Sequence, residues 1–86
     1  MEDEKSKWIK YAHVISSKNK IKIIKILEKP STPSGIAKEL KINISLVSRL
    51  LKLLLNEGII ACINPEDKKG KLFYLTELGK WIFNIL

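Results

Sequence analysis

Residues 32–58 read TPSGIAKELKINISLVSRLLKLLLNEG, a stretch that predicts two short helices with a tight joint between them. The first helix is predicted to begin at Pro33 with Thr32 as its N-cap, because the missing N–H of proline costs nothing at that position. The apolar residues of this helix recur at helical spacing and give it one buried face. They are Ile36, Ala37 and Leu40.

The second helix follows a joint at residues 41–43. Asn43 can accept a backbone N–H from the next turn, so it is the predicted N-cap of a helix that begins near Ile44. Gly58 is predicted to close that helix, because glycine readily adopts the left-handed conformation found at helix C-termini. Two short helices across a tight joint are typical of a helix-turn-helix.

The second helix, residues 44–57, carries one narrow polar strip on a surface that is otherwise apolar. At about 100° per residue, the apolar side chains cover more than half of its circumference; they are Leu46, Val47, Leu50, Leu51, Leu53, Leu54 and Leu55. The polar side chains gather in roughly a quarter of it; they are Ser45, Ser48, Arg49, Lys52 and Asn56. Alone, this pattern fits a core helix that meets water on one side. The preceding helix and the joint favour a recognition helix that enters the DNA major groove.

The segments before this stretch predict two further helices. Residues 1–6 are charged and are expected to fray, and a first helix is expected over residues 7–17. Asn19 is the predicted N-cap of a helix over Lys20–Lys29, which Pro30 stops because the residue before a proline avoids the helical region. Ser31 and Thr32 are predicted to add a very short strand.

After Gly58 the pattern changes to runs of β-branched and aromatic residues. Residues 59–63 (IIACI) and 71–76 (KLFYLT) predict two strands, and the turn-forming residues between them predict a β-hairpin. A last helix is predicted over residues 77–86 with Thr76 as its N-cap. The expected fold is therefore mainly α with a small β-hairpin, a winged helix-turn-helix, and residues 1–86 are expected to form one domain.

Composition limits the possible functions. The chain has 86 residues and a formal net charge of +7, which favours a polyanionic partner, although a lysine-rich soluble surface gives the same count. One cysteine and one histidine cannot form a disulfide or a four-ligand metal site within one chain. We expect Cys62 to be a small buried strand residue, with a redox or metal-sensing role as the less favoured alternative. We predict no metal, no cofactor and no enzymatic activity.

No apolar run approaches the roughly 20 residues that a membrane span needs, and the N-terminus lacks the core of a signal peptide. We therefore expect no membrane association and a cytoplasmic location. Glutamine is absent and Lys, Ile and Leu are plentiful, a composition that fits a thermophile, although an AT-rich genome would produce a similar bias.

Three motifs resemble a known family. Val47-Ser48-Arg49, Leu51-Lys52 and Glu57-Gly58-Ile59 match the helix-turn-helix of winged-helix transcriptional regulators of the ArsR and MarR type, found in bacteria and archaea. Residues 74–79 (YLTELG) resemble the end of the wing and the start of the last helix in that family. The resemblance implies a winged-helix DNA-binding regulator. It covers about residues 19–79.

Two features depart from the family pattern. Lys41 stands where the family usually has glycine, which implies a left-handed backbone at a lysine. Leu46 and Leu50 stand where polar residues commonly face DNA, so each faces either DNA or the core. Nothing resembles the cysteine-rich metal box of ArsR-type sensors, and we predict no small-molecule ligand.

The DNA-contacting side chains are predicted from three places. Ser45, Ser48 and Arg49 are expected to meet base edges, since arginine suits bidentate contact with guanine. Lys52, the start of the helix at Thr32 and the wing at residues 64–71 are expected to contact the backbone or minor groove. The predicted DNA contacts are Thr32, Ser34, Asn43, Ser45, Ser48, Arg49, Lys52, Lys68, Lys69 and Lys71.

The terminal helices are predicted to form a homodimer, because they carry more apolar surface than a monomer of this size readily hides. The alternative is that they complete a single core. The predicted interface residues are Trp8, Ala12, Ile15, Trp81, Ile82, Ile85 and Leu86.

Three hypotheses for function follow. The first is a small dimeric regulator that binds a specific double-stranded DNA sequence, expected to be a repressor because the length leaves no room for an effector module. The second is a winged helix used as a protein-interaction module in a larger complex. The third is an architectural protein that binds DNA without regard to sequence. Steep salt dependence would distinguish DNA binding from an apolar protein contact.

Overall fold

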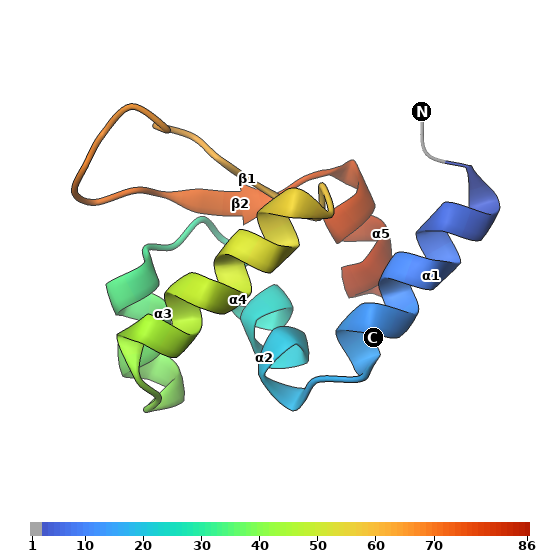
Figure 1. Ribbon diagram of the computed structural model, residues 1–86, viewed down its shortest axis with the longest axis horizontal. Helices are drawn as coiled ribbons and strands as arrows, with labels where there is room; N and C mark the ends of the chain where they lie inside the picture. The colour runs from blue at the N-terminus through green and yellow to red at the C-terminus, as the bar shows by residue number, and fades with distance from the viewer. Residues whose placement is uncertain (1–2) are drawn as a thin grey trace.

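The computed structural model describes residues 3–86. In chain order the elements are α1 (Glu4–Ile15), α2 (Lys18–Ile26), α3 (Pro33–Leu40), α4 (Ile44–Asn56), β1 (Ile60–Cys62), β2 (Phe73–Leu75) and α5 (Glu77–Ile85). Helices α3 and α4 form the helix-turn-helix, and β1 and β2 form an antiparallel hairpin above them (Figure 1). The predicted winged helix-turn-helix, mainly α with one small hairpin, is confirmed. No helix among the described residues is long and apolar enough to span a membrane.

Side-chain caps set the starts of the helices. Thr32, Asn43 and Thr76 each accept a backbone N–H from the first turn that follows, as predicted. The predicted cap at Asn19 is wrong. Ser17 caps α2 instead, with its hydroxyl oxygen accepting the Lys20 N–H at 3.3 Å, so the helix begins earlier than expected.

Two other predicted boundaries also need correction. Residues 3–6 were expected to fray, but the Asp3 carboxylate accepts the Ser6 N–H at 2.7 Å and starts α1 at Glu4. Residues 1–2 lie outside the described part of the chain. Helix α2 ends at Ile26 rather than Lys29, because the chain turns after Leu27 well before it reaches Pro30.

The hairpin is shorter than the sequence predicts, with three residues in each strand. Its register pairs Ile60 with Leu75 and Cys62 with Phe73. Ser31 bridges to Phe73 through N–H···O bonds of 3.0 and 2.9 Å, so the very short strand predicted at Ser31 and Thr32 is reduced to an isolated bridge at Ser31. The hairpin base is thereby attached to the chain that leads into the helix-turn-helix.

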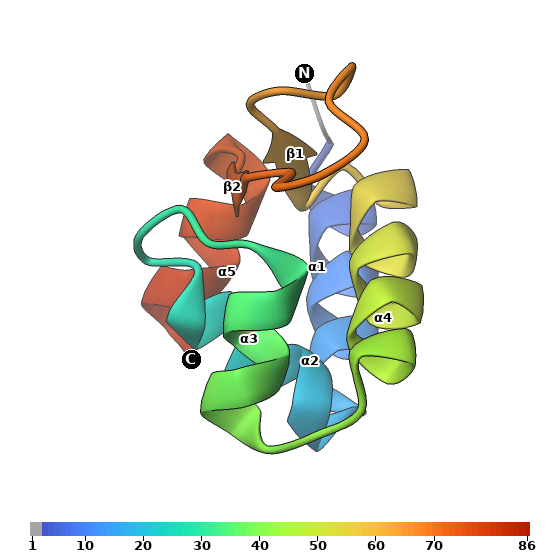
Figure 2. The ribbon, with the colours of Figure 1, turned by 90° about the vertical axis from the view of Figure 1, so that its left-hand side faces the viewer.

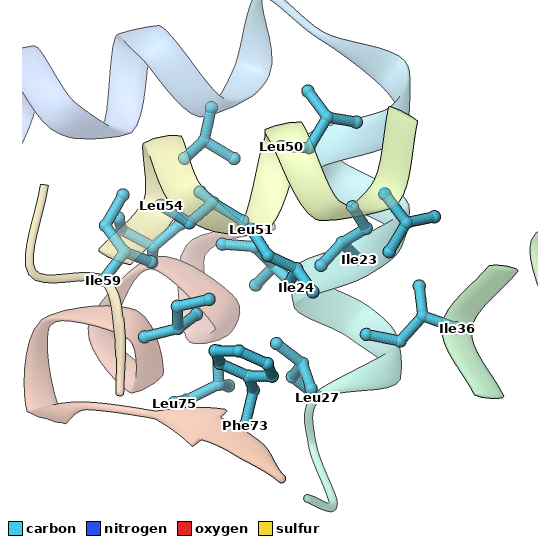
Figure 3. Packing of buried hydrophobic residues seen from close by; sticks show 14 of the residues in the cluster. Ile23, Ile24, Leu27, Ile36, Leu50, Leu51, Leu54, Ile59, Phe73 and Leu75 are labelled. Carbon is cyan, nitrogen blue, oxygen red and sulfur yellow. The ribbon is translucent and has the colours of Figure 1, made fainter. Parts of the chain in front are cut away.

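The core lies between α2, α3, α4, α5 and the inner face of the hairpin. Figure 3 shows the buried side chains of Ile23 and Ile24 in α2, and of Leu27 at its C-cap, packed between two groups. One group is the leucines of α4, and the other is Phe73 and Leu75 of β2. Val14 is the buried residue of α1, and Ile82 is the fully buried residue of α5. Leu53 and Leu55 of α4, which the helical wheel assigned to the apolar side, are exposed because they flank the contact surface rather than face it.

The two terminal helices meet at an aromatic cluster. The rings of Trp8 and Trp81 lie edge to face with centroids 5.0 Å apart, and Tyr11 completes the cluster. Such pairs contribute about 0.5–1.5 kcal/mol beyond the burial of their surface. The cluster therefore fixes α1 against α5 within one chain.

Thr76 and Gly79 join α5 to the hairpin. The Thr76 hydroxyl donates to the carbonyl oxygens of Gly58 and Ile59, at 2.6 and 2.9 Å, and its oxygen accepts the Gly79 N–H. A Cβ at Gly79 would overlap the Ile59 carbonyl oxygen, so only glycine allows this approach. The YLTELG motif therefore sets the angle between the hairpin and the last helix.

Candidate nucleic-acid interface

The polar strip of α4 faces outward. The side chains of Val47, Leu50, Leu51 and Leu54 are buried, whereas all five residues of the strip are exposed: Ser45, Ser48, Arg49, Lys52 and Asn56. On a helical wheel the strip lies opposite the buried side, because residues one or two turns apart share a face. Helix α4 therefore has one face fixed in the core and an opposite face open to a partner.

Leu46 and Leu50 pack inward. Leu50 is 8% exposed within the core, and Leu46 is half-buried against it. The departure from the family pattern is thus explained by packing, since these leucines extend the apolar side of α4. The outward face of α4 is left with serine, arginine, lysine and asparagine, flanked by the exposed apolar side chains of Ile44, Leu53 and Leu55.

The joint between α3 and α4 is tight and is held by local contacts. Lys41 adopts a left-handed conformation, with φ 58° and ψ 42°, as its place in the family pattern implies. The Ile42 N–H bonds back to the Ala37 carbonyl at 3.2 Å. The Asn43 side-chain oxygen accepts the Ser45 N–H at 2.7 Å. This cap occupies the Asn43 oxygen, so its amide N–H₂ is the group that remains for an outside partner.

The start of α3 has the same kind of cap. The Thr32 hydroxyl oxygen accepts the Gly35 N–H at 3.1 Å and lies 3.4 Å from the Ser34 hydroxyl. Thr32 is half-buried and Ser34 is exposed. A helix N-terminus with exposed hydroxyl groups has the chemistry that phosphate contacts use.

The loop between the strands, residues 63–72, is called the wing loop here. Lys68 and Lys69 are exposed in it, and Lys71 is half-buried. Figure 1 shows this loop at the same end of the molecule as α3 and the start of α4, and Figure 2, which looks at that end, shows all three on the near side. The fold therefore brings the predicted residues of the helix-turn-helix and of the wing to one end of the domain.

Asn64 organises the wing loop, a role that was not predicted from the sequence. Its amide nitrogen donates to the Asp67 carboxylate at 2.9 Å and to the Gly70 carbonyl at 3.1 Å. Its side-chain oxygen accepts the Leu72 N–H at 2.7 Å, so one side chain bridges both arms of the loop. The available signal was an asparagine followed by proline in a loop, since asparagine side chains commonly bond to nearby backbone groups in turns.

Cys62 lies at the base of the same loop. It is the predicted strand residue but is half-buried rather than buried, and its thiol lies 3.5 Å from the Asn64 side-chain oxygen. In residues 3–86, no three or more His, Cys, Asp or Glu side chains lie close enough together to hold a metal ion.

The predicted dimer residues are divided between surface and core. Trp8, Ala12, Ile15 and Ile85 are exposed, and Trp81 and Leu86 are half-buried. Ile82 is fully buried in the core of one chain, so its place in the predicted interface is wrong. Ile9, which was not among the predicted interface residues, is exposed beside Trp8.

Known proteins share this fold. The chain matches the adhesin competence repressor AdcR of Streptococcus pyogenes with 27% identity and a TM-score of 0.72, over 80% of this chain and 53% of that one. ZitR of Lactococcus lactis, solved in complex with DNA, matches with 29% identity and a TM-score of 0.70 over 77% of this chain and 47% of that one. The chain thus spans about half the length of these two proteins.

HlyU of Vibrio cholerae matches over 99% of this chain and 94% of its own, with a TM-score of 0.78 and 17% identity, a likeness that shows the fold alone. A comparison with curated protein sequences found no match. The family model for bacterial regulatory proteins of the arsR family matches residues 17–61, just over half of the chain, from the cap of α2 to the first residues of β1. The chain therefore belongs to the arsR family of winged-helix, DNA-binding transcription regulators.

Proposed function

We propose that this protein is a dimeric repressor that binds a specific double-stranded DNA sequence. The observation that supports this most directly is the outward face of α4, where Ser45, Ser48 and Arg49 are exposed opposite a buried apolar side. A helix fixed on one side by the core presents its other side with little loss of conformational entropy on binding. Base edges in the major groove offer the acceptors that an arginine fork fits.

The remaining residues of the interface are assigned to the DNA backbone. Lys52 is exposed further along the same face of α4, and Ser34 and Asn43 are exposed at the starts of α3 and α4. Thr32 and the wing residues Lys68, Lys69 and Lys71 complete the proposed phosphate and minor-groove contacts. These contacts position the protein on the duplex, whereas α4 supplies the sequence preference.

The proposed dimer uses the exposed apolar surface of the terminal helices. Trp8, Ile9 and Ile15 of α1 are 50%, 47% and 46% exposed, and Ile85 of α5 is exposed as well. Contiguous apolar surface on a small protein marks an interaction site. A two-fold dimer would set the two α4 helices about one turn of DNA apart, roughly 34 Å, and would favour a palindromic site.

Repression is proposed on two grounds. AdcR, a protein of similar fold and 27% identity, is named a repressor, and ZitR, at 29% identity, binds DNA in its solved complex. A small dimer that occupies an operator can block transcription by steric exclusion.

Selection of bound sequences from random duplex DNA tests the DNA-binding proposal. We expect enrichment of one palindromic sequence and an affinity that falls steeply as salt rises. Binding without enrichment would favour an architectural role, and failure to bind DNA at low salt would favour a protein-interaction module. Either result would contradict the proposal.

Sedimentation velocity tests the dimer. Ile15→Glu places a charge on the exposed face of α1 and should convert a dimer into a monomer. Ile44→Glu is the matched control, since Ile44 is 49% exposed at the start of α4, at the end of the molecule away from α1 and α5 (Figure 1). Wild-type protein that sediments as a monomer at high concentration would contradict the dimer.

A further inference from the structure

Helix α2 carries a row of lysines on its outward face. Lys18, Lys22 and Lys25 are exposed in α2, and Lys29 is exposed just after it. At about 100° per residue, the three lysines within the helix fall in roughly a sixth of the circumference. The buried residues of α2 and its C-cap, Ile23, Ile24 and Leu27, lie on the opposite side. These four residues, Lys18, Lys22, Lys25 and Lys29, are called the lysine row.

The charges of the lysine row are not neutralised by acidic side chains of the same chain. Within residues 3–86 no ion pair involves any of its four ammonium groups, although Glu28 is exposed next to Lys29. Lys18 and Lys22 are like charges four residues apart, and Lys18 stands at the positive end of the helix dipole; both are unfavourable to the helix, whereas Lys25 in the last turn is favourable. A face that serves only solubility usually mixes both signs of charge. The row therefore has a composition that suits an anionic partner.

Phosphate is the anion that this face fits. Lysine is depleted from protein–protein interfaces, and residues 18–29 include no aromatic side chain that could anchor a protein partner. Lysine binds phosphate as a point charge without directional demands. At about 1.5 Å per residue, Lys18 and Lys25 lie roughly 10 Å apart along α2. That length spans several phosphates of one DNA strand, which follow one another at about 3.4 Å along the helix axis.

The row and the strip on α4 face different directions. Both helices turn their apolar sides into the same core, and α2 packs on α1, α3 and α5. In Figure 2, α4 lies along one side of the domain, whereas α2 lies at its base behind α3. A contact between the row and a duplex bound at α4 would therefore have to use phosphates outside the groove that α4 occupies.

We propose that the lysine row of α2 is a second DNA contact, which binds backbone phosphates independently of sequence. This inference rests on the proposed function, because it adds a second DNA contact to the one proposed for α4. The row would add affinity and salt dependence without any preference for bases.

The test compares two double variants that remove the same charge. Lys22→Gln with Lys25→Gln removes half of the row, and Lys5→Gln with Lys80→Gln removes two exposed lysines from α1 and α5. Binding of each to a long duplex containing the selected sequence is measured over a range of salt. We expect the slope of log affinity against log salt to fall by about 2 in the row variant and to stay unchanged in the control. Lys22→Arg with Lys25→Arg should keep the wild-type slope.

Each other outcome overturns the inference. An unchanged slope in the row variant, while Arg49→Ala still alters site preference, would overturn this inference and leave the proposed function standing. An equal fall of the salt slope in both double variants would mean that the effect comes from net charge and not from the row. A changed site preference in the row variant would show that the row reads bases. Wild-type protein that binds no DNA would overturn the proposed function together with the inference.

Discussion

Helix α4 and the wing loop are held in place by different means. Four side chains of α4 are buried in the core, so many contacts fix its orientation. No residue of the wing loop is buried, and its two arms are joined by three hydrogen bonds of the Asn64 side chain and by the Ile63 N–H, which bonds to the Leu72 carbonyl at 2.8 Å. The face proposed to read bases is therefore supported by the packed core, whereas the loop proposed to contact the backbone is held by a few hydrogen bonds, most of which involve Asn64.

The largest effect is expected from the support of α4. Leu51→Ala removes a side chain that is 2% exposed and should lower the free energy of unfolding by about 2–5 kcal/mol. Leu53→Ala is the matched control, since Leu53 is exposed on the same helix and its loss should cost less than about 0.5 kcal/mol. Urea denaturation measures the free energy of unfolding of both variants. Equal destabilisation would mean that the core does not support α4 as described.

The second effect concerns the outward face of α4. Arg49→Ala should leave stability unchanged but cost about 1–3 kcal/mol of specific DNA affinity and relax the preference at one base position. Lys5→Ala, on the exposed surface of α1, should change neither. Site selection and equilibrium titration measure the two quantities. An unchanged preference would reassign Arg49 to a phosphate contact.

The third effect concerns the wing loop. Asn64→Ala removes the hydrogen bonds to Asp67, Gly70 and Leu72 and the weak one from the Cys62 thiol, and it should cost roughly 1 kcal/mol of stability, because each bond in solvent contributes only modestly. Trypsin should then cut faster at Lys68 and Lys69, and DNA affinity should fall equally for all sequences. Glu66→Ala, in the same loop, is the control. Wild-type cleavage rates in Asn64→Ala would show that other contacts hold the loop.

The smallest effect is expected from one wing lysine. Lys69→Gln should leave stability and site preference unchanged and should lower the salt slope of DNA binding by about 1. Titration over a range of salt measures the slope. A slope equal to that of the wild type would remove Lys69 from the backbone contacts.

Local chemistry made much of the fold predictable from sequence. The caps at Thr32, Asn43 and Thr76 depend on residues within one helical turn, so short-range rules identify them. The left-handed backbone at Lys41 followed from its position in the family pattern.

Features that depend on neighbours distant in sequence were harder to predict. A helical wheel separates polar from apolar sides, but it cannot tell that Leu50 is buried and Leu53 exposed, because that depends on where other helices pack. Ile82 was predicted in the dimer interface because its burial within one chain likewise depends on how the helices pack. Asn64 was missed because its partner Leu72 lies eight residues away, and a predicted hairpin does not show which side chains meet across its loop.

The proposed role of α4 is tested most directly by titrating isotope-labelled protein with the selected duplex and following each backbone amide by NMR. We expect the largest shifts at Ser45, Ser48 and Arg49, with smaller ones in the wing loop and none at the buried residues of α5. Shifts confined to α1 and α5, with the face of α4 unchanged at saturating DNA, would contradict the proposal that α4 reads the sequence.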